Sequence, residues 1–296
     1  MTYSSPFEGF VAPARARPQV WRLLAGLLLI VVVYVGWLAL MGAGVWVLTG
    51  LNQLESRLVS IGQGSDPTTL VVLLFTFTGM ALGAMLAARW MHGRSVGSLF
   101  GRPPVVLRDF ALGVGVLGGL ALVTGLPWLL FADLEPGLAW RVWLSFLPLA
   151  LVGLLVQTGA EELVFRGYLQ QQLAARFRSP LVWMVLPSVL FGLVHYAPAE
   201  MGANTWHVVL ATGVFGLVAA DLTARTGSLG LAWGLHFANN VVAILFVTAG
   251  GALDGMALGR LPYGPDDVDI MRPLIYADIA VLVLAWGLCR LAIRAR

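Results

Sequence analysis

The chain has 296 residues, of which 59% are hydrophobic and only 11% are charged, with a formal net charge of +3. Soluble domains carry about a quarter charged residues, so this composition excludes a soluble globular domain and predicts a polytopic membrane protein. All 18 basic residues are arginines, and the small net charge lies in predicted loops, which indicates membrane orientation and argues against nucleic acid as a partner. The single cysteine, Cys289, excludes an internal disulfide.

The expected fold is all-α, with about eight transmembrane helices. Residues 1–19 are polar and basic and predict a cytoplasmic N-terminal tail, and residues 20–296 are predicted to form a single membrane domain whose motif-bearing core covers about residues 142–250. The stretches 51–68 and 250–272 are predicted loops. The apolar runs predict spans, in chain order, at about residues 23–48, 69–88, 110–131, 142 onwards, 181–196, 206–223, 228–249 and 273–290.

Glycines are frequent in the third predicted span, and small residues allow membrane helices to approach closely. We expect this packing role for Gly113, Gly115, Gly118 and Gly119.

The arginines predict the orientation in the membrane. They cluster in alternate loops, whereas the remaining loops hold mostly acids, and basic loops stay in the cytoplasm. Both termini are therefore predicted to be cytoplasmic. His92 lies in one of the arginine-rich loops and is expected to be solvated. Abundant glycine, alanine and arginine without lysine is typical of a GC-rich bacterium, so we expect a multi-pass protein of the bacterial inner membrane.

An acidic motif, Thr158-Gly-Ala-Glu-Glu-Leu-Val-Phe-Arg-Gly167, follows the apolar run of the fourth span. Each ionisable group in a bilayer costs about 2.5–3.5 kcal/mol on insertion scales, so such groups indicate function. Glu162 and Arg166 stand four residues apart on one helix face and can pair. Glu161 lies about 100° around the helix and has no such partner. A purely structural ion pair would need no second glutamate. We therefore expect Glu162 and Arg166 to support the structure and Glu161 to be the functional carboxylate.

Three further polar residues fall in apolar spans: His195, His236 and Asn240. Counted from the nearest cytoplasmic arginines at ~1.5 Å per residue, these three and Glu161 lie roughly 16–26 Å deep. Residues from three distant helices can therefore meet at one level of the bilayer. Each also has a structural interpretation, as a hydrogen-bonded core histidine or as helix-packing polar contact. Residues 170–172, all glutamines, are expected to line a wet vestibule on the cytoplasmic side.

The group types predict a hydrolysis. A carboxylate beside an imidazole can take a proton from water, and a second histidine with an amide can donate hydrogen bonds to the oxyanion of an attacked carbonyl. No serine or cysteine is placed as an obvious nucleophile. The alternative is zinc held by Glu161, His195 and His236 with a water in the fourth position. The sequence has no His-Glu-x-x-His pair, and we favour the mechanism without metal or other cofactor.

Three motifs on successive predicted helices carry a family resemblance: Glu161-Glu162-x-x-x-Arg166, Phe191-x-x-x-His195 and His236-x-x-x-Asn240. In this order they resemble the CAAX-protease and bacteriocin-processing (CPBP, or Abi) family of intramembrane endopeptidases. The resemblance covers about residues 145–250. It implies that Glu161 and His195 activate water and that His236 and Asn240 form the oxyanion site.

In that family, eukaryotic members remove the last three residues of prenylated proteins, and bacterial members are linked to bacteriocin maturation and self-immunity. The resemblance implies an endopeptidase whose partners are membrane lipid and a peptide or protein substrate in or near the membrane. Two other functions stay open. One is a non-catalytic membrane protein that confers immunity or binds a partner, and the other is a proton- or ion-coupled transporter that uses Glu161. The oligomeric state is left open.

Overall fold

The computed structural model describes residues 5–295. Within this range the chain is mostly helical and has three short strands, which confirms the all-α prediction. The α-helices are α1 (Ser5–Val11), α2 (Val20–Thr49), α3 (Leu51–Gln63), α4 (Pro67–Thr76), α5 (Thr78–Leu86), α6 (Pro103–Leu129), α7 (Trp140–Glu162), α8 (Gln171–Arg176), α9 (Leu186–Leu193), α10 (Pro198–Met201), α11 (Thr205–Thr226), α12 (Gly230–Leu245) and α13 (Val268–Arg294).

Shorter 3₁₀ and π-helical segments extend or join these helices. They are η1 (Ala12–Ala16), η2 (Ala87–Met91), η3 (Val96–Leu99), η4 (Leu163–Gln170), η5 (Leu181–Val185) and η6 (Gly202–Asn204). The strands are β1 (Glu135–Pro136), β2 (Val247–Ala249) and β3 (Gly259–Leu261).

The apolar helices make this a multi-pass membrane protein. Among the described residues, 6 helices are long and apolar enough to cross a membrane: Val20–Thr49, Pro67–Met91, Val96–Leu129, Trp140–Arg176, Pro198–Thr226 and Val268–Arg294. The other two predicted spans are shorter helices, Leu181–Leu193 and Gly230–Leu245. At ~1.5 Å per residue they are about 20 and 24 Å long, less than the ~30 Å hydrocarbon core. All eight predicted helices exist, and six have spanning length.

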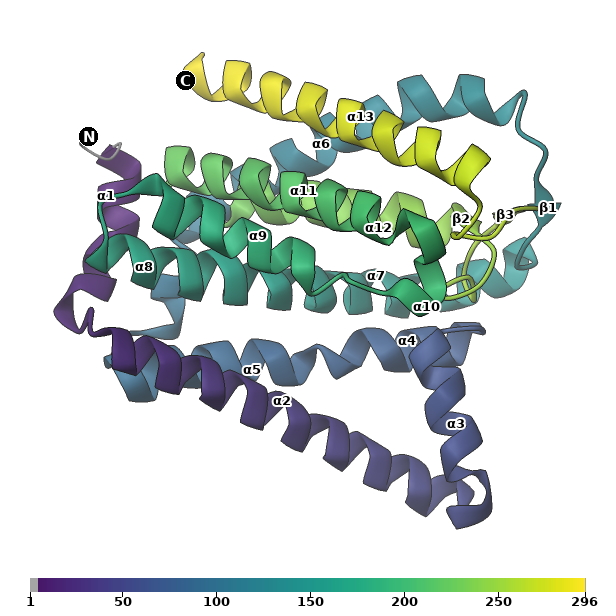
Figure 1. Cartoon of the computed structure of the whole chain (residues 1–296), viewed down its shortest axis with the longest axis horizontal. Coiled ribbons are helices and arrows are strands. Elements are labelled where there is room, and N and C mark those ends of the chain that lie inside the picture. The colour runs from purple at the N-terminus through teal and green to yellow at the C-terminus, as the bar shows by residue number, and fades with distance from the viewer. Residues whose placement is uncertain (1–4, 296) are drawn as a thin grey trace.

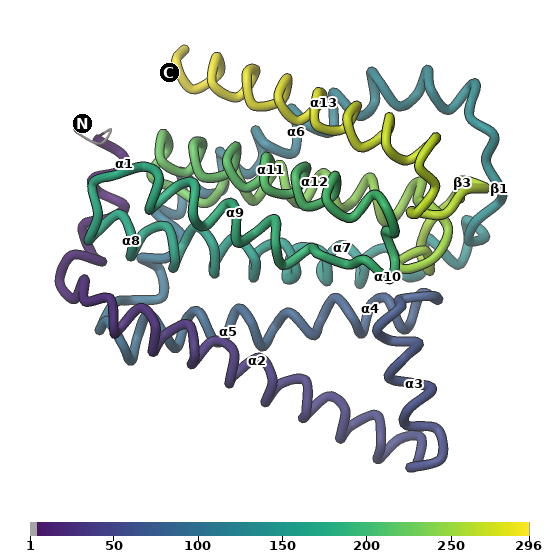
Figure 2. The backbone as a smooth tube through the Cα atoms, in the orientation of Figure 1, coloured from purple at the N-terminus to yellow at the C-terminus, as the bar shows by residue number. Residues whose placement is uncertain are grey.

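The two shorter helices lie in the middle of the bundle. Figure 1 shows α7, α9, α11 and α12 as the central group, with α6 and α13 on one side and α2 to α5 on the other. Helix α2 packs along α5 and diverges from α4 towards α3 (Figure 2). The C-terminal end of α13 and helix α1 lie at the same end of the molecule. This agrees with both termini on one side of the membrane.

Glycine contacts set the close packing of α6 against α12. A Cβ atom built at Gly113 would lie 2.7 Å from the carbonyl oxygen of Leu231, and one at Gly234 would overlap the carbonyl oxygen of Phe110. Only glycine permits this approach. The packing prediction is confirmed for Gly113, whereas a Cβ at the other three predicted glycines would meet open space. The contact matters because α12 carries His236 and Asn240.

The N-terminal segment packs against the membrane domain. We expected a polar tail, but Phe7, Phe10 and Val11 are buried, and the Phe7 ring lies 5.0 Å from the ring of Trp183. The apolar residues of α1 occur at helical spacing and share one face, which covers the end of the bundle. That this end faces the cytoplasm stays a prediction.

The predicted loop at 51–68 contains helix α3, so the loop prediction was wrong over Leu51–Gln63. Gly50 with φ 79° precedes the helix and Gly64 with φ 58° ends it, a conformation that glycine adopts readily. The segment was misread as a loop because α3 is an exposed helix that contains many polar residues.

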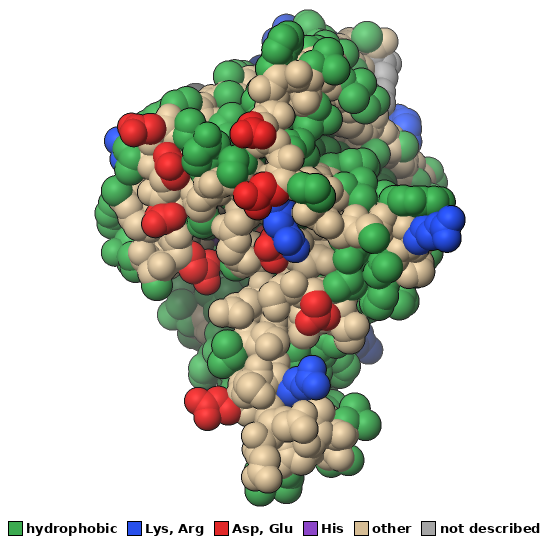
Figure 3. Space-filling view, turned by 90° about the vertical axis from the view of Figure 1, so that its right-hand side faces the viewer, with side chains coloured by type: hydrophobic (Ala, Val, Ile, Leu, Met, Phe, Trp, Pro, Cys, Tyr) green, Lys and Arg blue, Asp and Glu red, His purple; other side chains and the backbone are tan. Residues whose placement is uncertain are grey.

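The predicted loop at 250–272 contributes β3 to a three-stranded sheet of order β1-β3-β2. The β3 strand pairs antiparallel to β1 and parallel to β2. The sheet lies at the end opposite the termini, and Figure 3 shows carboxylates gathered on that face. Its exposed acids include Asp66, Asp133, Glu135, Glu200, Asp266 and Asp269. The positive-inside rule depends on the basic residues and gives acids little weight, so which end faces the cytoplasm stays a prediction.

Candidate active site

The acidic motif lies where the helix changes its winding. Helix α7 ends at Glu162, the π-helical segment η4 follows, and α8 continues to Arg176, which makes one continuous helix from Trp140. The stretch 157–174 is buried throughout. Short π-helical insertions occur frequently at functional sites because they shift side chains around the helix axis.

Arg166 and Glu162 form the predicted ion pair. Arg166 Nη1 donates to Glu162 Oε1 at 2.9 Å, and the two side chains are only 2% and 0% exposed. The guanidinium carbon also lies 4.5 Å from the ring centre of Phe191 and 5.6 Å from that of Phe215. A carboxylate and aromatic faces together compensate the buried cation. We therefore expect this buried ion pair to stabilise the packing at the centre of the bundle.

Glu161 is held by one oxygen and free at the other. Gln157 Nε2 donates to Glu161 Oε1 at 2.9 Å. Glu161 Oε2 is buried and accepts no hydrogen bond from residues 5–295, and it lies 3.5 Å from His236 Nε2. The prediction that Glu161 lacks an arginine partner agrees with this geometry.

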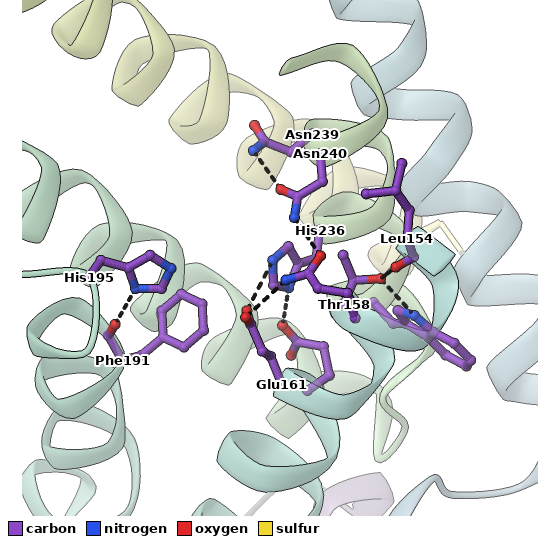
Figure 4. A network of polar contacts seen from close by, with 12 residues as sticks. Leu154, Thr158, Glu161, Phe191, His195, His236, Asn239 and Asn240 are labelled. Atoms are coloured by element: carbon purple, nitrogen blue, oxygen red, sulfur yellow. Dashed lines mark hydrogen bonds and ion pairs between the residues drawn. The ribbon is translucent and has the colours of Figure 1, made fainter. Parts of the chain in front are cut away.

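His236 lies between the two carboxylates (Figure 4). Its Nδ1 is 2.9 Å from Glu162 Oε1, and its Nε2 faces Glu161. Glu162 is thus shared between Arg166 and His236. A carboxylate accepts only, so the Nδ1 atom carries a proton. In the neutral ring Nε2 is then an acceptor, and Nε2 donates a hydrogen bond only when the ring is a cation.

His195 stands apart from this cluster. Its Nδ1 donates to the carbonyl oxygen of Phe191 at 2.8 Å, and in Figure 4 its ring lies to the side of Glu161 and His236. The Phe191 ring contacts both histidines, with centroid distances of 4.9 Å to His195 and 6.0 Å to His236. Because Nδ1 is the donor, Nε2 of the neutral ring carries a free lone pair.

Asn240 reaches the cluster through Gln157. Asn240 Nδ2 donates to Gln157 Oε1 at 2.8 Å, and its own Oδ1 accepts from Asn239 Nδ2 at 3.3 Å. Glu161 therefore faces His236 directly and is linked to Asn240 through Gln157. The Phe191 ring lies between His195 and His236.

The three side chains named as alternative zinc ligands do not converge in this structure. No group of three or more His, Cys, Asp or Glu side chains among residues 5–295 is arranged to hold a metal ion. Glu161 and His236 approach each other, but the ring of His195 is fixed on the Phe191 carbonyl and lies apart from them. The residues present supply two convergent ligands, whereas a catalytic zinc needs three.

Two expectations about the end of the bundle near the termini were wrong. The glutamines at 170–172 are at most 2% exposed, so they line no vestibule. They hydrogen-bond chain segments together, as in Gln170 Nε2 to Ala220 O at 3.0 Å and Gln171 Nε2 to Ser98 O at 2.9 Å. Amides that bond carbonyls of other segments stabilise packing and need no solvent.

His92 is likewise buried, at 2% exposure, and not solvated. Its Nδ1 contacts the carbonyl oxygen of Arg17 at 3.0 Å, and its Nε2 contacts the Tyr168 hydroxyl at 2.9 Å. The N-terminal segment covers His92 through this contact with Arg17. The arginines near His92 in the sequence could not indicate that burial.

Sequence reasoning missed Gln157. Its spacing of four residues from Glu161 places both on one helix face, so the signal was present. Thr158 was also not singled out. Its hydroxyl donates to Leu154 O at 2.7 Å and accepts from Trp233 Nε1 at 3.1 Å, a contact that joins α7 to α12.

The fold and this cluster together define a polytopic membrane protein with a buried carboxylate–imidazole–amide site. Residues 142–242 match the family model described as type II CAAX prenyl endopeptidase Rce1-like. The matched range contains Glu161, Glu162, Arg166, His195, His236 and Asn240. The match confirms the family resemblance found in the sequence, and it supports a membrane protease-like function.

The chain is also similar to the uncharacterized protein YyaK of Bacillus subtilis (strain 168). The two are 35% identical over 114 residues, which is 38% of this chain and 38% of that protein. No solved structure matches the chain.

Proposed function

We propose that the protein is an intramembrane endopeptidase of the bacterial inner membrane. Its substrate is a peptide or protein segment in or next to the lipid, and the nucleophile is water activated by Glu161. One observation carries this proposal: Glu161 Oε2 is buried, lies 3.5 Å from an imidazole nitrogen and accepts no hydrogen bond from residues 5–295. A buried carboxylate oxygen that needs a donor is suited to bind and deprotonate water.

The reaction then follows general base catalysis. Glu161 Oε2 takes a proton from water as the oxygen adds to the substrate carbonyl carbon. The resulting tetrahedral intermediate carries a negative oxygen. Its C–N bond breaks, the proton held by Glu161 passes to the leaving nitrogen, and a carboxylic acid and an amine are released. No covalent enzyme intermediate forms.

His195 is proposed to assist on the water side. Its Nδ1–H bond to the Phe191 carbonyl leaves Nε2 as an acceptor, which is the tautomer needed to orient or share the water proton. It is half-buried, so substrate and water can approach it. Its separation from Glu161 by an aromatic ring predicts a smaller share in catalysis than that of Glu161.

His236 and Asn240 are proposed to stabilise the oxyanion. Asn240 has a second N–H besides the one that bonds Gln157. His236 can donate from Nε2 only as an imidazolium, and its ring lies between the carboxylates of Glu161 and Glu162. Two charged or amide donors aimed at one oxygen are a common source of rate enhancement.

We propose no cofactor, and zinc remains the runner-up. Glu161, His195 and His236 do not converge, and the proposed mechanism uses no metal. The test is metal analysis of active protein before and after chelation. One zinc per chain, lost together with activity and restored with it, would replace the water-and-glutamate mechanism.

The central experiment is cleavage of a membrane-anchored peptide library by purified protein in liposomes, beside folded Glu161→Gln as the matched control. Glutamine has nearly the same shape as glutamate but is not a base. Cleavage by the wild type alone supports the proposal and begins to define the substrate. No cleavage by the wild type contradicts it and favours the non-catalytic immunity or partner-binding function.

A further inference from the structure

Among residues 5–295, Gln157 is the one side chain that hydrogen-bonds both Glu161 and Asn240. It lies on α7, one turn before Glu161, and is 7% exposed. Its Nε2 donates to Glu161 Oε1 at 2.9 Å, and its Oε1 accepts from Asn240 Nδ2 at 2.8 Å. It therefore joins the proposed base on α7 to the proposed oxyanion donor on α12.

The direction of these bonds is fixed by chemistry. Glu161 as a carboxylate only accepts, so the NH₂ group of Gln157 must face it and Oε1 must face away. Asn240 must then turn its NH₂ group towards Gln157. Its Oδ1 is left to accept from Asn239. The donors run in one direction, from Asn239 through Asn240 and Gln157 to Glu161.

We infer that Gln157 is a positioning residue for the reaction, acting through Glu161 and Asn240 without touching the substrate. This inference rests on the proposed function. By occupying Glu161 Oε1, Gln157 leaves Oε2 as the oxygen that meets water. By accepting one N–H of Asn240, it turns the other N–H to where an oxyanion develops.

A purely structural amide would act differently. Thr158, the next residue along α7, also bonds α12, through its hydroxyl and Trp233, and the other bond of that hydroxyl goes to Leu154 O, not to Glu161 or Asn240. Thr158→Val keeps the shape and removes that bond, so it is the matched control for losing an α7–α12 polar contact without disturbing the proposed machinery.

The test measures kcat and KM separately for wild type, Gln157→Leu and Thr158→Val, each checked for folding by thermal melting. A misplacement of about 1 Å can lower a rate about 10²-fold, so we expect Gln157→Leu to lower kcat by about that factor with KM changed less than about 3-fold. Thr158→Val should keep kcat within about 2-fold. If Gln157→Leu does not fold, Gln157→Met replaces it.

A double-mutant cycle with Asn240→Ala tests the coupling. If Gln157 acts partly through Asn240, its substitution must lower kcat less in the Asn240→Ala background than in the wild type. Three results would overturn the positioning role: fully additive effects in the cycle, a kcat of Gln157→Leu equal to that of Thr158→Val, or a change confined to KM. None of these results would contradict the proposed peptidase activity. A wild type that cleaves nothing would overturn the proposed function and this role together.

Discussion

Two buried polar clusters form around the same continuous helix, Trp140–Arg176, and differ in what they can do. The motif cluster comprises Gln157, Glu161, Glu162, Arg166 and His236. The end cluster, near the termini, comprises His92, Arg94, Tyr168, Gln171 and Gln172. Both are nearly inaccessible. The motif cluster holds two carboxylates around an imidazole, whereas the side chains of the end cluster include no carboxylate.

The partners differ as well. In the end cluster, side chains bond one another, as in Arg94 Nη1 to Gln172 Oε1 at 2.7 Å. They also bond carbonyl oxygens of the N-terminal segment and of η3, as in His92 to Arg17 O and Gln171 to Ser98 O. These bonds tie chain segments to the bundle. In the motif cluster most bonds join side chains, and Oε2 of Glu161 and Oε2 of Glu162 accept no hydrogen bond from residues 5–295. Of these two oxygens, Glu161 Oε2 lies 3.5 Å from His236 Nε2. Burial of polar groups alone therefore does not indicate chemistry, but a positioned base with an open oxygen does.

The largest expected effect is on activity in the motif cluster. Glu161→Gln should lower kcat by about 10⁴-fold, the upper end of what a general base contributes, and should leave the melting temperature nearly unchanged. The comparison is Gln172→Leu in the end cluster, which should keep kcat per folded molecule. Substrate cleavage and thermal melting of both variants measure this, and an active Glu161→Gln would remove Glu161 from the mechanism.

The next effect is on stability. Glu162→Leu should lower the free energy of unfolding by about 3–5 kcal/mol, because it leaves the Arg166 cation buried without its carboxylate. The double variant Glu162→Leu/Arg166→Met should recover most of that loss. Unfolding in mixed detergent micelles reports both values. A single variant as stable as the wild type would show that the ion pair does not hold the bundle centre.

A smaller effect is expected at His195. His195→Gln should lower kcat by about 10²-fold, the lower end of the range for acid–base groups, since the ring does not contact Glu161 directly. Its one bond, to the Phe191 carbonyl, predicts little change in folding. Steady-state kinetics on the substrate found with the wild type measure the loss. Unchanged kcat would leave Glu161 as the sole base.

The smallest effect is a pH dependence of stability from the end cluster. Burial, more than the nearby Arg94, Arg22 and Arg17, lowers the pKa of His92 below its ordinary 6.5. As pH falls below 6.5, the unfolded state therefore binds a proton before the folded state does, and stability drops. Burial also lowers the pKa of Arg94 to about 10, so Arg94 stays charged throughout this range.

Melting temperatures of wild type and His92→Gln between about pH 8 and about pH 5 test this sign. The wild type should lose stability towards acid, and the variant should show a flatter profile. A wild type that becomes more stable towards acid would mean that His92 gains its proton on folding.

Local sequence determined much of the site. The apolar runs indicated every long helix, and spacing of four residues indicated the Glu162–Arg166 pair and could have indicated Gln157 with Glu161. These contacts follow from helix geometry alone, since residues i and i+4 share a face whatever lies around them. The depth comparison also brought His236 and Asn240 to the level of Glu161, because rise per residue is a property of the helix.

Tertiary structure decided the partners between helices. The bond of His236 to Glu162 and the burial of His92 and of the glutamines at 170–172 depend on how the helices rotate and on which segment covers them. Glycine contacts such as that of Gly113 with α12 fix those rotations. A sequence pattern sets which residues share a face of one helix, but packing between helices sets what that face meets.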